Sequence, residues 1–208
     1  EMVPCPWKIF LRQRQDAVSR QGLSLEEADR LRPIFEPLLR DGVTGLWNGM
    51  FRYAVVKETT GLARQTGQPV FYVEWDAANL GGVNALLGHS GANERFLVPM
   101  AQLIVSGLDI LVENHGGFHV TFRHGGDEFS SIIYGVGNGS AADRTKPRTL
   151  TCHLDTIVRT ASAYARRVGL HQIEHPKHKG CPKHRGVGLY YGLSEFRDDQ
   201  SLLRRDRR

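Results

Sequence analysis

An acidic turn between two apolar runs is the feature that most constrains how this chain can fold. The run Phe118–Phe122 precedes the turn, the run Ser131–Tyr134 follows it, and the turn itself is Arg123–Phe129, with the sequence R-H-G-G-D-E-F. Short runs rich in β-branched and aromatic residues are typical of strands, and glycines allow the backbone angles of a tight turn. The sequence therefore predicts a β-hairpin with two adjacent acids at its tip, where a bulky ligand can approach the main chain.

The two acids of this turn, Asp127 and Glu128, have two interpretations. Held on a rigid hairpin, their carboxylates are well placed to bind a divalent cation. Glycine and aspartate are also common in solvated turns that bind nothing. The turn by itself does not distinguish a metal site from a solvated turn.

Composition indicates one ordinary globular domain. With 208 residues, 40% of them hydrophobic and 24% charged, the chain is long enough to bury a core. No apolar run approaches the roughly 20 residues of a membrane span, and the first residues show no secretion signal. Three widely spaced cysteines, Cys5, Cys152 and Cys181, suit a reducing compartment. We therefore expect a soluble, cytoplasmic protein without a membrane partner.

The net charge of +5 is concentrated at the end of the chain and in the stretch Lys177–Arg185. Basic patches attract phosphate-bearing partners. We interpret the terminal arginines as a solvated end. The surplus of positive charge is too modest to indicate a nucleic-acid partner.

Four histidines and one cysteine lie around the second of these basic stretches. Their nitrogen and sulfur atoms suit zinc, but their spacing matches no standard zinc finger. The alternative is a basic hairpin that attracts phosphate or is simply solvated. The residues are His171, His175, His178, Cys181 and His184.

The N-terminal part of the chain is predicted to form short helices followed by a longer one. The segment Ser24–Glu27 has the pattern of a capping box, which predicts the start of a helix. Pro33 and Pro37 limit that helix to a short or kinked element. The apolar spacing from Gly45 to Arg64 predicts a second helix.

The remaining elements alternate between strands and helices. Asp76 is predicted to lie at the end of a strand and before a polar turn. The alternation, with one hairpin, predicts an α/β (α+β) sandwich with a mostly antiparallel sheet and helices on its faces. The elements are a strand at Val70–Trp75, a helix from Asn93 to about Asn114 stopped by Gly116 and Gly117, a helix at Leu154–Val168 closed by Gly169, and a strand at Gly186–Leu193.

Asp76 and Asp127 are expected to come together on neighbouring strands. Two close carboxylates repel each other, and a divalent cation relieves that repulsion while it bridges to phosphate oxygens. This is the arrangement used in metal-dependent phosphoryl and nucleotidyl transfer. Spacing alone makes this a weak indication.

Four motifs in this chain, in the same order, resemble those of GGDEF domains, the domains of diguanylate cyclases. Asp41–Asn48 resembles the opening D-x-L-T-G-L-x-N, and Asp76–Asn93 resembles the segment D-x-D-x-F-K-x-x-N-D-x-x-G-H-x-x-G-D. Arg123–Phe129 matches the signature itself, and Gly188–Leu193 resembles the later S-I-G strand. The resemblance implies a palm-like nucleotidyl cyclase fold for residues 41–208, preceded by an N-terminal extension at 1–40.

The resemblance also implies an activity and a metal site. In this family two protomers, each holding one GTP with Mg²⁺ or Mn²⁺, join the two nucleotides into cyclic di-GMP. By resemblance, Asp76 and Asp127 ligate the metal with help from the Ala77 carbonyl. Glu128 is either a further metal ligand or the group that assists deprotonation of the 3′-hydroxyl.

The same resemblance assigns residues to the nucleotide. Backbone amides near Ala78, Asn79 and Leu80 would meet the phosphates. Asn84 would read the edge of guanine, because an amide both donates and accepts hydrogen bonds. The hairpin glycines Gly125 and Gly126 would let the substrate approach.

Several positions depart from the family pattern. The second base-reading residue, usually Asp, is Asn93, which replaces an acceptor oxygen with a donor. That change would weaken guanine binding or admit adenine. Gly81 stands where the family has a lysine, Ala85 where it has an acid, and Gly49 where it has an arginine.

Two further departures concern binding of the triphosphate and of the product. The family continues after the last strand with a basic helix, A-K-x-x-G-R-N, for which this chain has no match. Either the chain is cut short, or the terminal arginines substitute, or triphosphate binding is weak. The family's inhibitory R-x-x-D site falls on Gly116 and His119, so product feedback through it is not expected.

These observations leave three hypotheses. The first is a metal-dependent cyclase that acts as a homodimer and condenses two GTP, or another NTP, into a cyclic dinucleotide. The second is a catalytically impaired GGDEF-like module that binds a nucleotide or a protein partner. The third is a palm-like nucleotidyltransferase that acts on other nucleotides. The intact acids favour the first hypothesis, whereas Gly81, Asn93 and the unmatched basic helix favour the second.

Overall fold

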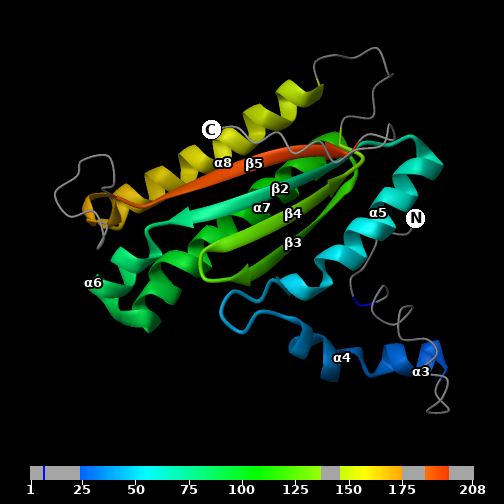
Figure 1. Ribbon diagram of the computed structural model, residues 1–208, viewed down its shortest axis with the longest axis horizontal. Coiled ribbons are helices and arrows are strands. Elements are labelled where there is room, and N and C mark those ends of the chain that lie inside the picture. Colours follow the sequence, from blue (N-terminus) through cyan, green and yellow to red (C-terminus); the bar gives the residue numbers. More distant parts are fainter. Residues whose placement is uncertain (1–6, 8–23, 137–145, 175–185, 197–208) are drawn as a thin grey trace.

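The computed structural model describes residues 7, 24–136, 146–174 and 186–196 (Figure 1). The helices are α3 (Leu25–Arg30), α4 (Arg32–Phe35), α5 (Arg52–Thr66), α6 (Leu80–Ala92), α7 (Val98–His115) and α8 (Lys146–Arg167), with short 3-10 or π segments η1 (Glu36–Leu39), η2 (Gly49–Phe51), η3 (Asn93–Leu97) and η4 (Leu170–Gln172). The strands are β1 (Trp47–Asn48), β2 (Val70–Ala78), β3 (Phe118–Gly125), β4 (Glu128–Tyr134) and β5 (Gly188–Phe196).

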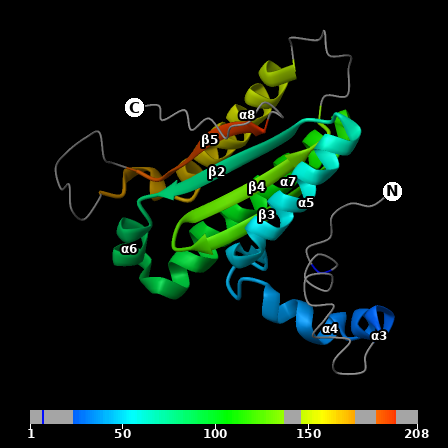
Figure 2. The ribbon, with the colours of Figure 1, turned by 45° about the vertical axis from the view of Figure 1, so that its right-hand side comes forward.

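The five strands form one sheet in the order β1-β3-β4-β2-β5. Among the described strands only the short β1 is parallel to its neighbour, and the other pairs are antiparallel. Helices α7 and α8 pack on one face, and α5 lies on the other (Figures 1 and 2). The predicted α+β sandwich with a mostly antiparallel sheet is therefore confirmed.

Alternation along β2 decides which side chains reach solvent. Phe71, Val73 and Trp75 point toward α7 and α8 and are buried, whereas Glu74 and Asp76 point to the opposite face and are exposed. Successive strand residues alternate between faces, so this division follows from the pleat. Helix α5 covers the Val70 end of that opposite face and leaves the Asp76 end open.

The predicted helix start and its early end are confirmed. The Ser24 hydroxyl accepts a hydrogen bond from the Glu27 amide at 3.1 Å, and the Glu27 carboxylate accepts one from the Ser24 amide at 2.8 Å. The prolines then divide the chain into α3, α4 and η1, each of six residues or fewer.

The predicted helix from Gly45 to Arg64 was wrong at its start. The chain first makes a turn in which Asp41 accepts hydrogen bonds from the Thr44 amide and hydroxyl, both at 2.7 Å. Strand β1 then pairs with β3, and α5 begins only at Arg52. Pairing with a distant strand overrides the helical spacing of the apolar residues.

The polar turn predicted after Asp76 was also wrong. Strand β2 continues to Ala78, and α6 begins at Leu80 after a single left-handed residue, Asn79, with φ +69°. Adjacent glycines disfavour a helix in isolation, so local preference does not reveal α6. Gly82 is required by packing, because a β-carbon there would lie 2.8 Å from the Glu174 carbonyl oxygen.

The long apolar helix is confirmed, with additional detail. It comprises η3 and α7, and it ends at Gly116, where φ is +77°. The span Leu80–His115 is long and apolar enough to cross a membrane by length and composition alone, which qualifies the expectation from sequence. Core helices have the same property, and this span is bent at Gly88, with its inner side chains packed on the sheet.

The remaining predicted elements are found within the described residues. Strands β3 and β4 form the expected hairpin, α8 ends before Gly169, and β5 forms the last strand. Most of the histidine-rich segment, from residue 175 to 185, lies outside the described residues. So do the terminal arginines.

Candidate functional site

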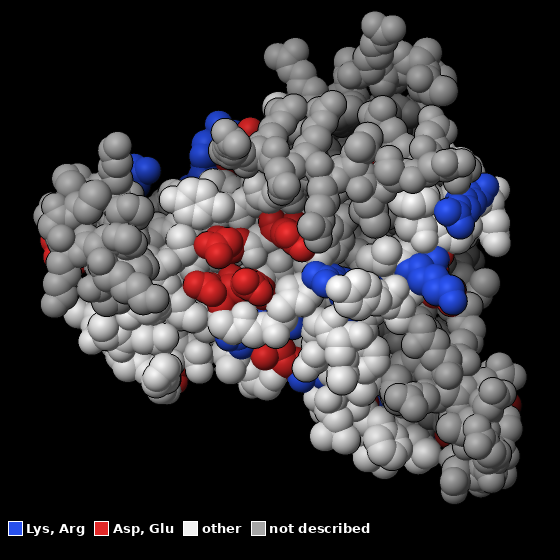
Figure 3. Space-filling model, viewed as in Figure 1, with Lys and Arg blue, Asp and Glu red and all other residues white. Residues whose placement is uncertain are grey.

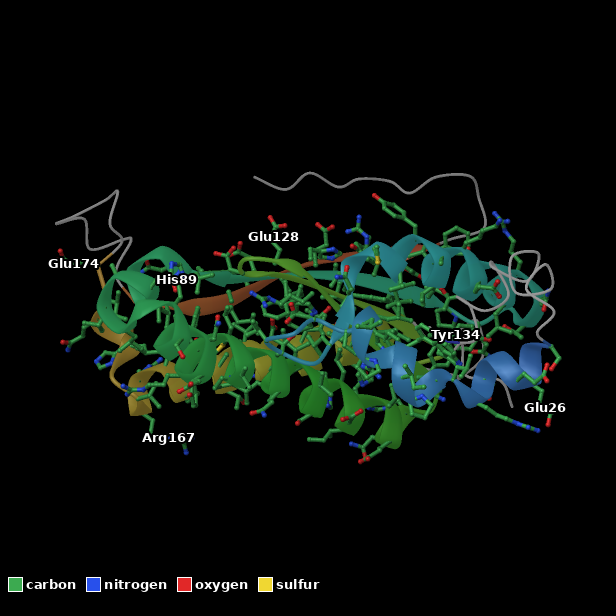
Figure 4. The ribbon with its side chains drawn as sticks, turned by 90° about the horizontal axis from the view of Figure 1, so that it is seen from below. Glu26, His89, Glu128, Tyr134, Arg167 and Glu174 are labelled. Carbon is green, nitrogen blue, oxygen red and sulfur yellow. The ribbon has the colours of Figure 1, made fainter. Side chains whose placement is uncertain are left out.

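Asp76 and Glu128 occupy directly opposite positions on β2 and β4. Opposed residues of an antiparallel pair share a face and have Cα atoms roughly 4.5–5.5 Å apart. Both side chains are exposed on the face that carries α5. In Figure 3 acidic side chains gather over the ends of these two strands, and in Figure 4 Glu128 points away from α7 and α8.

Asp127 joins this pair from the tip of the hairpin. The register shifts between Arg123 and Gly125, and Gly125 and Gly126 have φ values of +135° and +55°. Residues other than glycine rarely adopt such backbone angles. The turn is anchored to the end of β2, because the Asp127 carbonyl accepts a hydrogen bond from the Ala77 amide at 2.9 Å. Both glycines predicted at the site are thus needed to shape it.

The three acids lie close enough to repel one another electrostatically. Burial raises the pKa of Asp76 above its ordinary value, and the negative charges of Asp127 and Glu128 raise it further. Within the described part of the chain, no Lys or Arg forms an ion pair with any of the three. An unneutralised group of acids of this kind attracts cations.

The oxygen donors present here fit a divalent cation in their chemistry. Mg²⁺ and Mn²⁺ bind carboxylate and carbonyl oxygens, which Asp76, Asp127, Glu128 and the Ala77 carbonyl supply. In the described ranges no three His, Cys, Asp or Glu side chains already converge on one point. The acids would therefore have to change rotamer to share an ion.

The turn that connects β2 to α6 is held by Asn79. Its side-chain nitrogen donates to the carbonyls of Ile173 and Gly186 at 3.2 and 3.0 Å, and its side-chain oxygen accepts from the Gly82 amide at 3.2 Å. The Asn79 side chain is therefore engaged in structure. Leu80, also predicted to contact substrate, is half-buried against the core, and only its amide is suited to a ligand.

The two asparagines predicted to read the base lie on consecutive helical segments. Asn84 is on α6 and Asn93 begins η3, with the kink at Gly88 between them. Both are half-buried, and neither side chain is hydrogen-bonded to another residue of the described ranges. The exposed His89 directly follows the kink and lies at the end of the molecule formed by α6 (Figure 4).

An ion pair between the buried Arg123 and the half-buried Asp41 connects the signature to the opening motif. Arg123 donates from Nη1 to both carboxylate oxygens of Asp41, at 2.9 and 3.1 Å, and from Nη2 to the Gly126 carbonyl at 2.7 Å. Although partial burial acts to raise it, hydrogen bonds from Thr44 and the charge of Arg123 hold the pKa of Asp41 below its ordinary value. Sequence reasoning did not assign this role to Asp41.

His124 and Gly49 form a second contact that sequence reasoning missed. A β-carbon at Gly49 would lie 2.3 Å from Nδ1 of His124, so the absence of a side chain at position 49 makes room for the imidazole. His124 shares a hydrogen bond with the Ser130 hydroxyl at 2.8 Å. Burial lowers the pKa of His124, and the nearby Arg52 lowers it further. The departure noted at Gly49 is thus explained by packing.

Comparison with solved structures identifies the fold. No protein-family model and no curated protein sequence matches the chain. The GGDEF domain of DgcB from Caulobacter crescentus, solved with c-di-GMP, has a TM-score of 0.55 and 16% identity, over 79% of this chain and 81% of that one. The FimX GGDEF domain from Pseudomonas aeruginosa has a TM-score of 0.55 and 16% identity, over 78% and 83%.

A third structure contains a protein partner. The diguanylate cyclase SiaD from Pseudomonas aeruginosa, solved with its activator SiaC, has a TM-score of 0.53 and 19% identity, over 91% of this chain and 62% of that one. At these identities the similarity is one of fold. This chain has the fold of a GGDEF domain.

Proposed function

We propose that this protein is a metal-dependent nucleotidyl cyclase of the diguanylate cyclase type, which condenses two molecules of GTP, or of another NTP, into a cyclic dinucleotide. The observation that carries the proposal is the opposition of Asp76 and Glu128 on the open face of the sheet, with Asp127 beside them and no cation among the described residues to neutralise them. The fold shared with DgcB, a protein solved with c-di-GMP, supports it.

The acids would hold Mg²⁺ or Mn²⁺ together with the Ala77 carbonyl. Such an ion neutralises phosphate charge and makes a hydroxyl easier to deprotonate. Asp76 and Asp127 bind and orient it. Glu128 either completes the ligand set or takes the proton of the attacking 3′-hydroxyl, a role for which its exposed carboxylate is available.

The first turn of α6 would bind the phosphates. The amides of Leu80 and Gly81 begin a helix, whose unpaired N-terminal amides favour anions. Asn79 keeps this turn in position through its three hydrogen bonds. The open backbone at Gly125 and Gly126 leaves space on the other side of the acids.

Base recognition would fall to Asn84 and Asn93. An amide at position 93 can donate to N1 of adenine, whereas N1 of guanine itself carries a proton. The proposal therefore includes both GTP and ATP as candidate substrates. Because each protomer would hold one nucleotide, turnover requires a homodimer, and we propose that the dimer acts in the cytoplasm.

Product analysis tests the proposal. The full chain is incubated with each NTP and Mg²⁺ or Mn²⁺, at concentrations at which it is dimeric, and products are resolved by mass. A cyclic dinucleotide is expected from at least one NTP, and Asp127→Ala should abolish it. The control, Glu113→Gln, changes an exposed acid of α7 and should leave it unaffected.

The result also separates the alternatives. Nucleotide binding without any product would contradict the cyclase and favour the binding module, for which a protein partner is then sought, as SiaC is for SiaD. A product that is a linear or mixed nucleotide would favour a nucleotidyltransferase of another specificity.

A further inference from the structure

Tyr190 on β5 lies in the same row across the sheet as Asp76 on β2 and Glu128 on β4. In the register of the sheet, Asp76 is opposed by Glu128 on one side and by Tyr190 on the other. Opposed residues of antiparallel strands project from the same face. The phenol of Tyr190 therefore stands on the open face, immediately beside the candidate metal ligand.

The two consecutive tyrosines of β5 have opposite environments. Tyr191 faces the core, where its ring centroid lies 5.7 Å from that of Trp75 and its hydroxyl donates to Asp155 at 2.8 Å. Tyr190 is 63% exposed, and no residue in the described ranges is hydrogen-bonded to its hydroxyl. Packing and a hydrogen bond therefore give Tyr191 a structural role, whereas no hydrogen bond within the described residues gives one to the exposed Tyr190.

The Tyr190 ring leans along β5 toward the first turn of α6. A β-carbon built at Gly188 would lie 3.4 Å from Cε2 of Tyr190 and 3.6 Å from its hydroxyl oxygen, so the ring lies over Gly188. Gly188 is in turn opposed by Ala78, the last residue of β2. Only Asn79 separates Ala78 from the N-terminus of α6. The hydroxyl is thus directed along β5, away from Asp76 and toward the end of the sheet at which α6 begins.

We propose that Tyr190 contacts the substrate, with its hydroxyl donating a hydrogen bond to a phosphate oxygen of the bound nucleoside triphosphate. This inference rests on the proposed function. A phenol is neutral at pH 7 and can donate, so it adds a contact for phosphate without forming an ion pair with the adjacent acids. Because residue 81 is glycine, the first turn of α6 offers a phosphate only backbone amides. The Tyr190 hydroxyl would add a side-chain donor to them.

Binding measurements on the full chain test the contact. The probes are 3′-deoxy-GTP and 3′-deoxy-ATP with Mg²⁺, which cannot be condensed because they lack the attacking hydroxyl, and the matching 3′-deoxynucleosides, which lack phosphates. Tyr190→Phe removes only the hydroxyl. It should weaken triphosphate binding roughly ten-fold, the usual effect of losing one hydrogen bond to a charged group, and leave nucleoside binding unchanged.

A matched control is Tyr164→Phe on α8, on the opposite face of the sheet, where the hydroxyl donates to the Arg95 carbonyl. It should leave both affinities unchanged. Unchanged triphosphate affinity in Tyr190→Phe would overturn the inference while leaving the proposed function intact. A Tyr190→Ala variant that weakens nucleoside and triphosphate equally would also overturn it, because the ring would then contact the base. If the unmodified protein binds neither triphosphate, the proposed function fails and the inference with it.

Discussion

Asp76 and Glu128 oppose each other on two antiparallel strands, and within the described residues neither is paired with a Lys or Arg. Asp76→Asn should therefore stabilise the metal-free protein slightly, by about 0.5 kcal/mol, because it removes repulsion at an exposed site. The same variant should lose the stabilisation that Mg²⁺ or Mn²⁺ gives the unmodified protein. Urea unfolding with and without metal measures both effects, and a variant that still gains stability from metal would contradict the site.

Metal stabilisation should depend on pH through Asp76. Burial and the two neighbouring acids raise its pKa, so the folded protein takes up a proton at a pH where the unfolded chain is still ionised. The contribution of Asp76 to stability without metal therefore increases as the pH falls through the raised pKa, whereas metal binding, which needs the carboxylate, decreases over the same range. The difference in thermal unfolding between the unmodified protein and Asp76→Asn, measured with and without Mn²⁺ between pH 7 and 4, checks the two opposite trends; parallel trends would refute this assignment.

The ion pair between Asp41 and Arg123 should contribute strongly to stability. Asp41→Asn leaves a guanidinium that is only 8% exposed without its counter-ion, at a cost of about 2 kcal/mol. Because the folded pKa of Asp41 is lowered, this contribution is complete above the ordinary pKa of aspartate and is lost as the pH falls through the lower folded value. Glu26→Gln breaks an exposed pair with Arg30 and serves as control, with an expected loss below about 0.5 kcal/mol.

Two helical glycines should respond oppositely to alanine. Gly82→Ala places a methyl group 2.8 Å from the Glu174 carbonyl oxygen and from Cγ2 of Ile173, and should destabilise the protein by about 2 kcal/mol. Gly61→Ala, in α5, meets nothing within 4 Å and should stabilise it by about 0.5–1 kcal/mol. Denaturant midpoints of the two variants measure the difference. Equal effects would show that Gly82 is not held by packing.

Asn93→Asp should change base preference. A carboxylate restores the acceptor that guanine N1–H and its exocyclic amine require, so the ratio of GTP to ATP affinity should rise about ten-fold. Calorimetry with the 3′-deoxy triphosphates gives that ratio. Asn114→Asp, at the exposed end of α7, is the control and should not alter it. An unchanged ratio in the Asn93 variant would remove this residue from base recognition.

Local patterns in the sequence were enough to predict much of the fold. The capping box at Ser24, the apolar spacing of α7 and the hairpin around Gly125 and Gly126 each depend on residues close together in the chain, and each is confirmed. The motifs from Asp41 to Ser194 also indicated the GGDEF fold that the solved structures show.

Tertiary contacts decided the rest. The first turn of α6 contains two glycines, which disfavour a helix in isolation. Position 82 is glycine because the backbone at Glu174 leaves no room for a side chain. The row of Glu128, Asp76 and Tyr190 exists only through strand register, which joins residues far apart in sequence. The sequence by itself determined which acids the chain carries, but only pairing of distant strands decided that they share one open face, because side-chain direction in a sheet is set by register.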